Sequence, residues 1–324
     1  MNEERQILLV TTRNDFSADL LIAELGRRGA PCVRWNLEDF PIQSQLTWRP
    51  ETGAALLKSG AQTHPWNAFK SAWYRRTAPP RLPAELAPGG MTDFAIKEIA
   101  VFLEGVWDTT ECFWVNPPAR VRAAENKLWQ LATAKGIGFA IPRTVVTNDP
   151  SAVCELVRSV PAAIAKAISC SGTEFEGETW SLFTRPVTET DLQPQMAIRV
   201  APCIFQERIE RKSDIRVTVV GSRLYSAEIT IRGERAVGET DWRAVDSKHL
   251  AYEPHTLPVK LAELCQSMLR QLGLKYGCFD FLRTTDDRYV FLEINPSGQW
   301  GWIEHEVGAP ITKALAELLI EAEV

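Results

Sequence analysis

Two short apolar segments near the carboxyl end of the chain each carry polar side chains with oxygen donors. The segment 279–281 reads FDF and the segment 291–295 reads FLEIN. Both are typical of buried β-strands, on which residues two apart point to the same face. Glu293 and Asn295 then share a face, and Asp280 on an adjacent strand adds a third oxygen donor. Such hard oxygen ligands are those that Mg²⁺ prefers, so these three residues are the candidate metal ligands.

The composition narrows the class of protein. The chain has 324 residues, 41 acidic and 36 basic side chains, and a formal charge of −5. An acidic balance argues against nucleic acid as a partner, because phosphate backbones bind to basic surfaces. No apolar run approaches the ~20 residues that cross a bilayer, and the polar residues before Ile7 are unlike an export signal. The seven cysteines are scattered without a C-x-x-C pair, which favours reduced thiols in the cytoplasm.

The opening of the chain alternates between strand and helix. A strand at 6–12, a helix ending near Gly26 and a strand at 32–35 predict a small doubly wound α/β sheet. The turn after the first strand lacks G-x-G-x-x-G, so nucleotide binding is not assigned to this unit. A hairpin, a strand and a long helix are expected next, at residues 46–57, 71–75 and 92–106.

The length predicts about two domains, and the Asn-Pro-Pro sequence at 116–118 marks a boundary between them. We therefore expect an N-terminal domain at 1–115 and a second domain at 116–324, the latter made of two lobes, 116–205 and 206–324. Apolar periodicity in the second domain predicts helices at 119–135, 152–157, 259–272 and 311–322. Alternating or continuous apolar runs predict strands at 144–146, 163–168, 180–183, 204–209, 214–220, 223–231, 276–283 and 289–294.

Several short motifs resemble those of ATP-grasp ligases in order and spacing. They are Asn126-Lys127, the strand lysine Lys166, Phe205-Gln206-Glu207, Asp214-Ile215-Arg216-Val217 and the trio Asp280, Glu293 and Asn295. The segments WYRR at 73–76 and NPSGQW at 295–300 are similar to the microviridin-type, or graspetide, branch. The resemblance implies an ATP-grasp fold preceded by a small doubly wound pre-ATP-grasp domain.

The resemblance also implies roles for individual residues. Lys127 and Lys166 would lie along the phosphates of ATP, with Mg²⁺ on the trio. The hinge residues Gln206, Glu207 and Ile209 would meet the adenine, and Asp214 would lie near the ribose. Taken alone, Lys127 is more typical of a solvated surface charge, whereas a lysine inside the apolar strand of Lys166 needs a partner.

The same resemblance assigns Arg216 and Arg232 to the γ-phosphate and the developing acylphosphate, a task that suits a guanidinium. A solvated surface arginine is the alternative for each. The segment 169–178, SCSGTEFEGE, suits a mobile lid over phosphates, with a plain hairpin loop as the alternative. The four histidines show neither metal spacing nor a Ser-His-Asp arrangement.

The function implied is an ATP- and Mg²⁺-dependent ligase that forms ester or amide links between side chains of a ribosomal precursor peptide. The peptide would consist of a leader and a core, and relatives imply a homodimer. Two alternatives stay open. One is an ATP-grasp ligase that adds amino acids to a carboxylate, and the other is a nucleotide-dependent peptide-binding module without catalysis.

Overall fold

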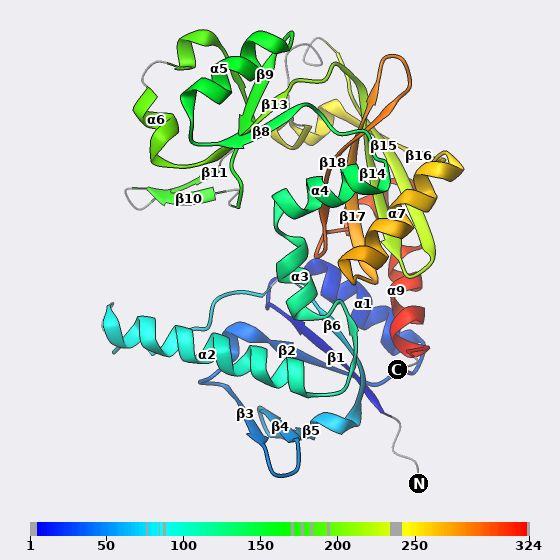
Figure 1. Cartoon of the computed structure of the whole chain (residues 1–324). Helices are drawn as coiled ribbons and strands as arrows, with labels where there is room; N and C mark the ends of the chain where they lie inside the picture. Colours follow the sequence, from blue (N-terminus) through cyan, green and yellow to red (C-terminus); the bar gives the residue numbers. More distant parts are fainter. Residues whose placement is uncertain are drawn as a thin grey trace.

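The computed structural model describes residues 5–75, 77–83, 85–86, 89–169, 172–175, 178–181, 184–192, 195–233 and 242–322. It confirms the α/β class, with helices packed on several separate sheets (Figure 1). The predicted domain boundaries at 115/116 and 205/206 stay predictions. No helix in the described part of the chain is long and apolar enough to cross a membrane.

A four-stranded parallel sheet forms the first part of the chain, in the order β2-β1-β6-β7. Its strands are β1 (Gln6–Thr11), β2 (Cys32–Asn36), β6 (Phe69–Tyr74) and β7 (Phe113–Val115). Alternate residues of the buried strand β1 enter different cores, Ile7 on one face and Leu8 on the other. Helices α1 (Phe16–Arg27) and α9 (Ile311–Ile320) cover the first face, and α2 (Gly90–Thr109) covers the second. The predicted doubly wound unit is confirmed.

The expected hairpin is part of a larger antiparallel sheet. Strands β3 (Ser44–Arg49) and β4 (Ala54–Ser59) form it, and an unpredicted third strand, β5 (Gln62–Pro65), pairs with β4. The strand β5 reads QTHP and is too short and polar to show strand periodicity.

The long helix predicted at 119–135 is wrong, because two helices occupy this segment. Helix α3 (Pro118–Ala124) ends before Asn126, and α4 (Lys127–Ile137) begins after it. The Asn126 side chain accepts hydrogen bonds from the backbone N–H groups of Leu128 and Trp129, at 3.0 and 3.1 Å. This N-cap satisfies two donors that a continuous helix would have used internally, so the chain starts a new helix there.

The middle of the chain forms a second four-stranded sheet in the order β12-β9-β13-β8. Its strands are β8 (Thr144–Thr147), β9 (Ala163–Lys166), β12 (Arg185–Val187) and β13 (Cys203–Glu207). Helices α5 (Pro150–Ser159) and α6 (Gln195–Val200) belong to this part, as does a hairpin of β10 (Gly172–Phe175) and β11 (Glu178–Ser181). Strand β12 and helix α6 were not predicted, because each is very short.

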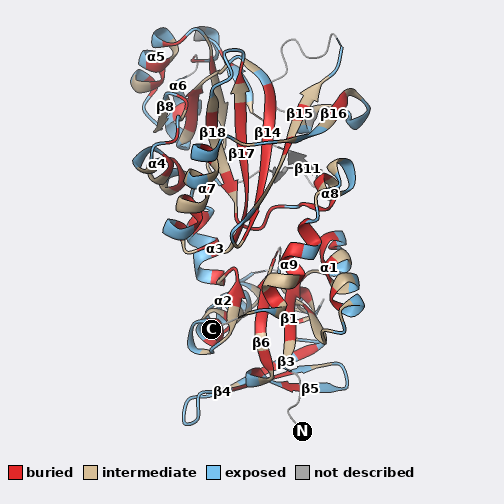
Figure 2. Ribbon diagram, turned by 90° about the vertical axis from the view of Figure 1, so that its right-hand side faces the viewer, coloured by how far each residue is buried: buried red, intermediate tan, exposed pale blue. Residues whose placement is uncertain are grey.

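The last part is a five-stranded antiparallel sheet in the order β16-β15-β14-β17-β18. The strands are β14 (Arg211–Val220), β15 (Arg223–Ile231), β16 (Leu250–His255), β17 (Tyr276–Thr284) and β18 (Tyr289–Asn295). Strands β14 and β17 are almost wholly buried (Figure 2). Apolar residues on one face of the sheet pack with α7 (Val259–Leu272), and α8 (Gly301–Val307) follows β18. The edge strand β16 was not predicted.

One buried asparagine ties the first sheet to the last. Asn116, which follows β7, donates hydrogen bonds to the carbonyl oxygens of Tyr276 and Pro296, at 2.8 and 3.0 Å. Its Oδ1 accepts from the backbone N–H groups of Lys275 and Tyr276, at 2.7 and 2.9 Å. All four bonds of this amide therefore fix the start of β17 and the turn after β18 to the end of β7.

Candidate active site

The three predicted metal ligands lie on neighbouring strands of the last sheet. Asp280 on β17 is paired in register with Glu293 on β18, and Asn295 lies opposite Cys278. Glu293 and Asn295 are two residues apart on β18, and Asp280 lies opposite Glu293, so the three side chains share one face of the sheet. Within the described residues, no three His, Cys, Asp or Glu side chains gather as a metal cluster. The candidate ligand set is instead two carboxylates and one amide.

Asp280 is buried between two guanidinium groups. Its carboxylate accepts hydrogen bonds from Arg216 Nη1, at 2.8 and 2.9 Å, and from Arg243 Nη2, at 2.6 Å. Burial alone would raise the pKa of the Asp280 carboxyl, but the positive charges of Arg216 and Arg243 outweigh burial and hold the pKa below its ordinary value. Asp280 is therefore ionised at neutral pH, as a metal ligand must be.

Two cations reach Glu293, of which Arg243 also contacts Asp280. Lys127, the first residue of α4, places its Nζ 3.5 Å from Glu293 Oε2, and Arg243 Nη2 lies 3.6 Å from Glu293 Oε1. The helix cap at Asn126 thus has a consequence for the site, because it sets where α4 begins and directs Lys127 towards β18.

The turn after β18 packs directly under Arg216. The Tyr276 hydroxyl donates a 2.6 Å hydrogen bond to the carbonyl oxygen of Gly298, and Arg216 Nη2 lies 3.5 Å from the carbonyl oxygen of Gln299. A Cβ at position 298 would lie 2.6 Å from Cys278 Sγ and 2.9 Å from Arg216 Nη2. Only glycine fits there, so the turn is shaped to hold Arg216 against Asp280.

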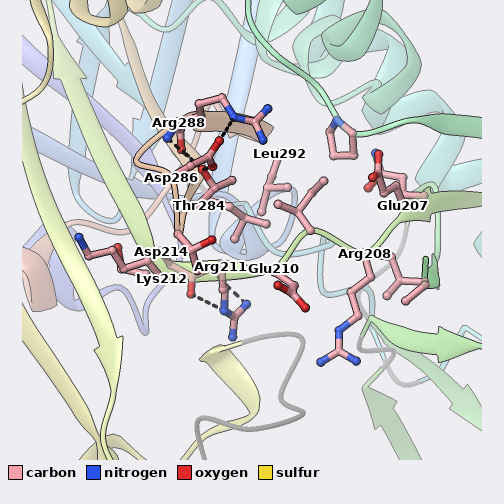
Figure 3. Close-up of a pocket in the computed structure, with 18 of the residues that line it drawn as sticks. Glu207, Arg208, Glu210, Arg211, Lys212, Asp214, Thr284, Asp286, Arg288 and Leu292 are labelled. Atoms are coloured by element: carbon pink, nitrogen blue, oxygen red, sulfur yellow. Dashed lines mark hydrogen bonds and ion pairs between the residues drawn. The ribbon is translucent and has the colours of Figure 1, made fainter. Parts of the chain in front are cut away.

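A large pocket adjoins this cluster, and it is shown in Figure 3. Its volume is about 860 Å³, and its lining comes from both the middle and the last sheets. Leu282 and Leu292 give it an apolar wall, while Glu207 and Asp214 are among its polar groups. Leu282 lies two residues beyond Asp280 on β17, so the pocket lies beside the carboxylate cluster, although its described lining includes none of the three candidate metal ligands.

Four of the residues predicted for the nucleotide line this pocket, namely Gln206, Glu207, Ile209 and Asp214. The Gln206 side chain donates to Thr144 Oγ1 at 2.9 Å, whereas its buried Oε1 has no hydrogen-bond partner among the described residues. A buried acceptor without a donor is costly unless a ligand supplies one. Asp214 is buried and forms an ion pair with Arg211 at 3.2 Å.

Two further residues predicted for the nucleotide and the acylphosphate, Lys166 and Arg232, are absent from the described lining of this pocket. Lys166 is half-buried at the end of β9, in register with Ile204. Arg232 is exposed just beyond β15, and its backbone N–H donates to the carbonyl oxygen of His249 at 2.7 Å. The structure describes the predicted lid segment only in part, as the hairpin of β10 and β11, and Cys170 lies outside the described residues.

Arg243 is the site residue that the sequence analysis missed. It lies in a short 3₁₀ helix, Trp242–Ala244, and its guanidinium lies over the Trp242 ring with 5.2 Å between its carbon and the ring centroid. No strand or helix periodicity surrounds it. The adjacent tryptophan was the one available signal, because arginine stacks on aromatic rings and is well suited to bind phosphates.

Comparison with known proteins identifies the family. A family model described as the MvdD pre-ATP grasp domain matches residues 6–122. The macrocyclase MdnB from Microcystis aeruginosa MRC is 30% identical, the match covers 98% of this chain and 100% of MdnB, and the TM-score is 0.82. A RiPP-associated ATP-grasp ligase from Chryseobacterium gregarium, solved with ADP and a leader and core peptide, is 27% identical, with a TM-score of 0.88. The match covers 99% of this chain and 98% of the Chryseobacterium ligase.

The chain belongs to the RiPP-associated ATP-grasp ligases. The predicted ATP-grasp fold with an N-terminal pre-ATP-grasp domain is confirmed. Macrocyclase MdnC from the same Microcystis strain, solved with its precursor peptide MdnA, is 27% identical over 98% of this ligase and all of MdnC, with a TM-score of 0.85. A probable alpha-L-glutamate ligase of Teredinibacter turnerae is 27% identical over 211 residues, which is 64% of this chain and 67% of that ligase.

Proposed function

We propose that this ligase uses ATP and Mg²⁺ to form ester or amide crosslinks between side chains of a ribosomal precursor peptide. The observation that carries the proposal is the ionised, buried Asp280 paired with Glu293 beside a nucleotide-sized pocket, in a chain that is similar over its whole length to two macrocyclases. ATP would phosphorylate an Asp or Glu carboxylate of the peptide. A hydroxyl or amine of the same peptide would then attack the acylphosphate and release phosphate.

The donor set fits Mg²⁺, since it consists of ionised carboxylates and an amide oxygen. Asp280, Glu293 and Asn295 are proposed to hold the metal, which when bound would neutralise charge on the phosphates. Among this chain's own groups, Arg216 is proposed to stabilise the charge that develops on the transferring phosphoryl group. Arg232 is proposed to assist at the acylphosphate.

The pocket fits an adenine nucleotide. Leu282 and Leu292 offer apolar surface to a base, and the unpaired buried Oε1 of Gln206 would accept a hydrogen bond from an exocyclic amino group. The hinge at Gln206, Glu207 and Ile209 is proposed to meet the adenine, with Asp214 near the ribose. Lys127 and Lys166 are proposed to lie along the phosphates, and the Lys127 ion pair with Glu293 supports this placement.

The proposed partner is a precursor peptide with a leader and a core. The leader would supply binding energy away from the chemistry, which allows several carboxylates to be placed in turn at one site. We further propose that the ligase forms a homodimer and acts in the cytoplasm.

The decisive experiment mixes the purified ligase with ATP, Mg²⁺ and a candidate precursor peptide that contains a leader and a core. We expect the peptide to lose one water for each ADP formed, as followed by mass spectrometry and a coupled ADP assay. The Asp280→Asn variant should form neither product. An unchanged peptide and no ADP would contradict the proposal and favour a binding module without catalysis.

One alternative is supported by two relatives, from Teredinibacter turnerae and Pseudoalteromonas atlantica, which are named as probable alpha-L-glutamate ligases. Such an enzyme would add glutamate to a carboxylate instead of linking two side chains. The same mass measurement distinguishes the two reactions, since the product would then gain the mass of one amino-acid residue.

A further inference from the structure

A second cavity lies between the N-terminal sheet unit and the turn that carries the candidate site. It has a volume of about 520 Å³ and lies between α1 and α8. Phe16 and Leu20 form one wall, and Trp302 forms part of the other. Gly301 is at the contact of the two helices, where an added Cβ would lie 3.1 Å from Leu20 and 3.3 Å from Phe16. We call this cavity the α1–α8 groove.

Two sets of contacts link the groove to the residues around Asp280. Gln299 lines it, and the carbonyl oxygen of this residue lies 3.5 Å from Arg216 Nη2. Trp302 packs against Trp242 with 5.2 Å between ring centroids, and the neighbouring Arg243 contacts Asp280. The rings of Trp242 and Trp302 therefore form an aromatic surface that extends from Arg243 into the groove, and a peptide bound at Asp280 could contact it.

The chemistry of the groove favours an apolar occupant. Phe16 is 67% exposed although it is a large hydrophobic residue. The one carboxylate in the lining, that of Glu304, already accepts hydrogen bonds from the backbone N–H and the hydroxyl of Thr312, at 2.8 and 2.5 Å. Ser17, Gln299 and His305 are the other polar residues of the lining. The large side chains Phe16, Leu20 and Trp302 still offer aromatic and aliphatic faces, and these select apolar side chains.

We infer that the α1–α8 groove binds an aliphatic or aromatic side chain of the core peptide, close in sequence to the acidic residue being activated. This inference rests on the proposed function, to which it adds a specificity site. In an extended peptide, residues two apart point the same way at roughly 7 Å spacing. A peptide whose carboxylate lies at Arg216 thus places a neighbouring side chain over Gln299 and against Trp302. The groove would select core sequences and orient the acid for phosphorylation.

The test measures whether a substitution in the groove changes the preference of the ligase between two precursor peptides. The cognate precursor is made with leucine or with serine at the position two residues from the acid that is linked first. With wild-type ligase, the serine peptide should have a kcat/KM roughly tenfold lower. With Phe16→Ser or Trp302→Ala, the two peptides should differ by less than about threefold. Phe94→Ser is the matched control, since Phe94 is 57% exposed on α2, and it should keep the full discrimination.

A photochemical measurement tests the location without requiring turnover. The same peptide position is replaced by p-benzoylphenylalanine, the complex with ADP and Mg²⁺ is irradiated, and the adduct is mapped by mass spectrometry. Adducts within 16–20 or 299–305 support the inference. Adducts elsewhere would overturn the inference. Equal discrimination between the two peptides by wild-type ligase and by Phe16→Ser would also overturn it, provided that both proteins still crosslink the peptide. If no peptide loses water and no ADP forms, it is the proposed function that fails.

Discussion

At the scale of single residues, the candidate site consists of oppositely charged side chains in direct contact. Arg216, Arg243 and Lys127 surround the two carboxylates of Asp280 and Glu293. Two of these cations share the same oxygen, since both Arg216 and Arg243 lie within 2.8 Å of Asp280 Oδ2. A metal ion bound there must displace one of them. The side chain of Arg243 is 40% exposed, against 7% for Arg216, so we expect the metal to displace Arg243.

The first prediction follows from this competition. In Arg243→Gln, Mn²⁺ should bind to the nucleotide-free protein roughly two- to fivefold more tightly, because the resident cation is removed while the carboxylates remain. Electron paramagnetic resonance of Mn²⁺ measures this affinity directly. Arg27→Gln is a matched control, as Arg27 is an exposed arginine paired with Glu24 on α1. Unchanged or weaker Mn²⁺ binding by Arg243→Gln would show that Arg243 does not compete with the metal.

The second prediction concerns Glu293. Glu293→Gln should lower peptide-dependent ADP formation by at least about a hundredfold, since a charged ligand is replaced by a neutral one. The melting temperature should change little, because the substitution keeps the volume of a side chain that is 29% exposed. A coupled ADP assay and thermal unfolding provide the two readouts. Turnover at the wild-type rate would remove Glu293 from the metal site.

At the scale of elements, the position of the site depends on contacts between sheets that are far apart in the chain. Asn116 is 1% exposed and holds both β17 and the turn after β18 through four hydrogen bonds. Asn116→Ala should therefore lower the free energy of unfolding by about 2–4 kcal/mol, because it leaves buried backbone groups without partners. Urea unfolding tests this. Asn148→Ala, which removes an exposed 3.3 Å hydrogen bond to Arg199, should cost less than about 0.5 kcal/mol.

The elements also show how far a sequence can be interpreted. The strands β14, β17 and β18 were predicted because buried strands carry long apolar runs, and they brought Asp280 and Glu293 together as expected. The edge strands β12 and β16 were missed, since an edge strand buries little and shows weak periodicity. The break at Asn126 was missed because local capping overrode a continuous helical pattern. Arg243 has no periodic context, so only the folded chain reveals its contact with Asp280.

At the scale of the whole molecule, an ion-pair network joins the two ends of the described chain. Arg28, which directly follows α1, pairs with Glu24 at 2.7 Å and with Glu317 of α9 at 2.9 Å, and Arg223 also binds Glu317. Hydrogen bonds from Arg27 and Arg28 lower the pKa of Glu24 to about 2, and those from Arg223 and Arg28 lower the pKa of Glu317.

This network gives a pH-dependent prediction. Because both carboxyls have lower pKa values in the folded state, their contribution is complete above the unfolded value of about 4.5 and is lost as the pH falls towards 2. Arg28→Ala should lower the melting temperature by roughly 1–3 °C at pH 7. That difference should shrink steadily between pH 4.5 and pH 3 in scanning calorimetry. A difference that stays constant over this range would show that the ion pairs do not contribute.

Helix α9 packs on the same face of the first sheet as α1, and Ser71 of β6 donates a 2.8 Å hydrogen bond to the carbonyl oxygen of Leu319. During translation, the first sheet is made more than two hundred residues before this helix leaves the ribosome. Until then, the face of the sheet that contains Ile7 and Leu9 has only one of its two covering helices, α1. Part of this apolar face must therefore stay open in the nascent chain until α9 is made, and α9 then completes the core that β1 began.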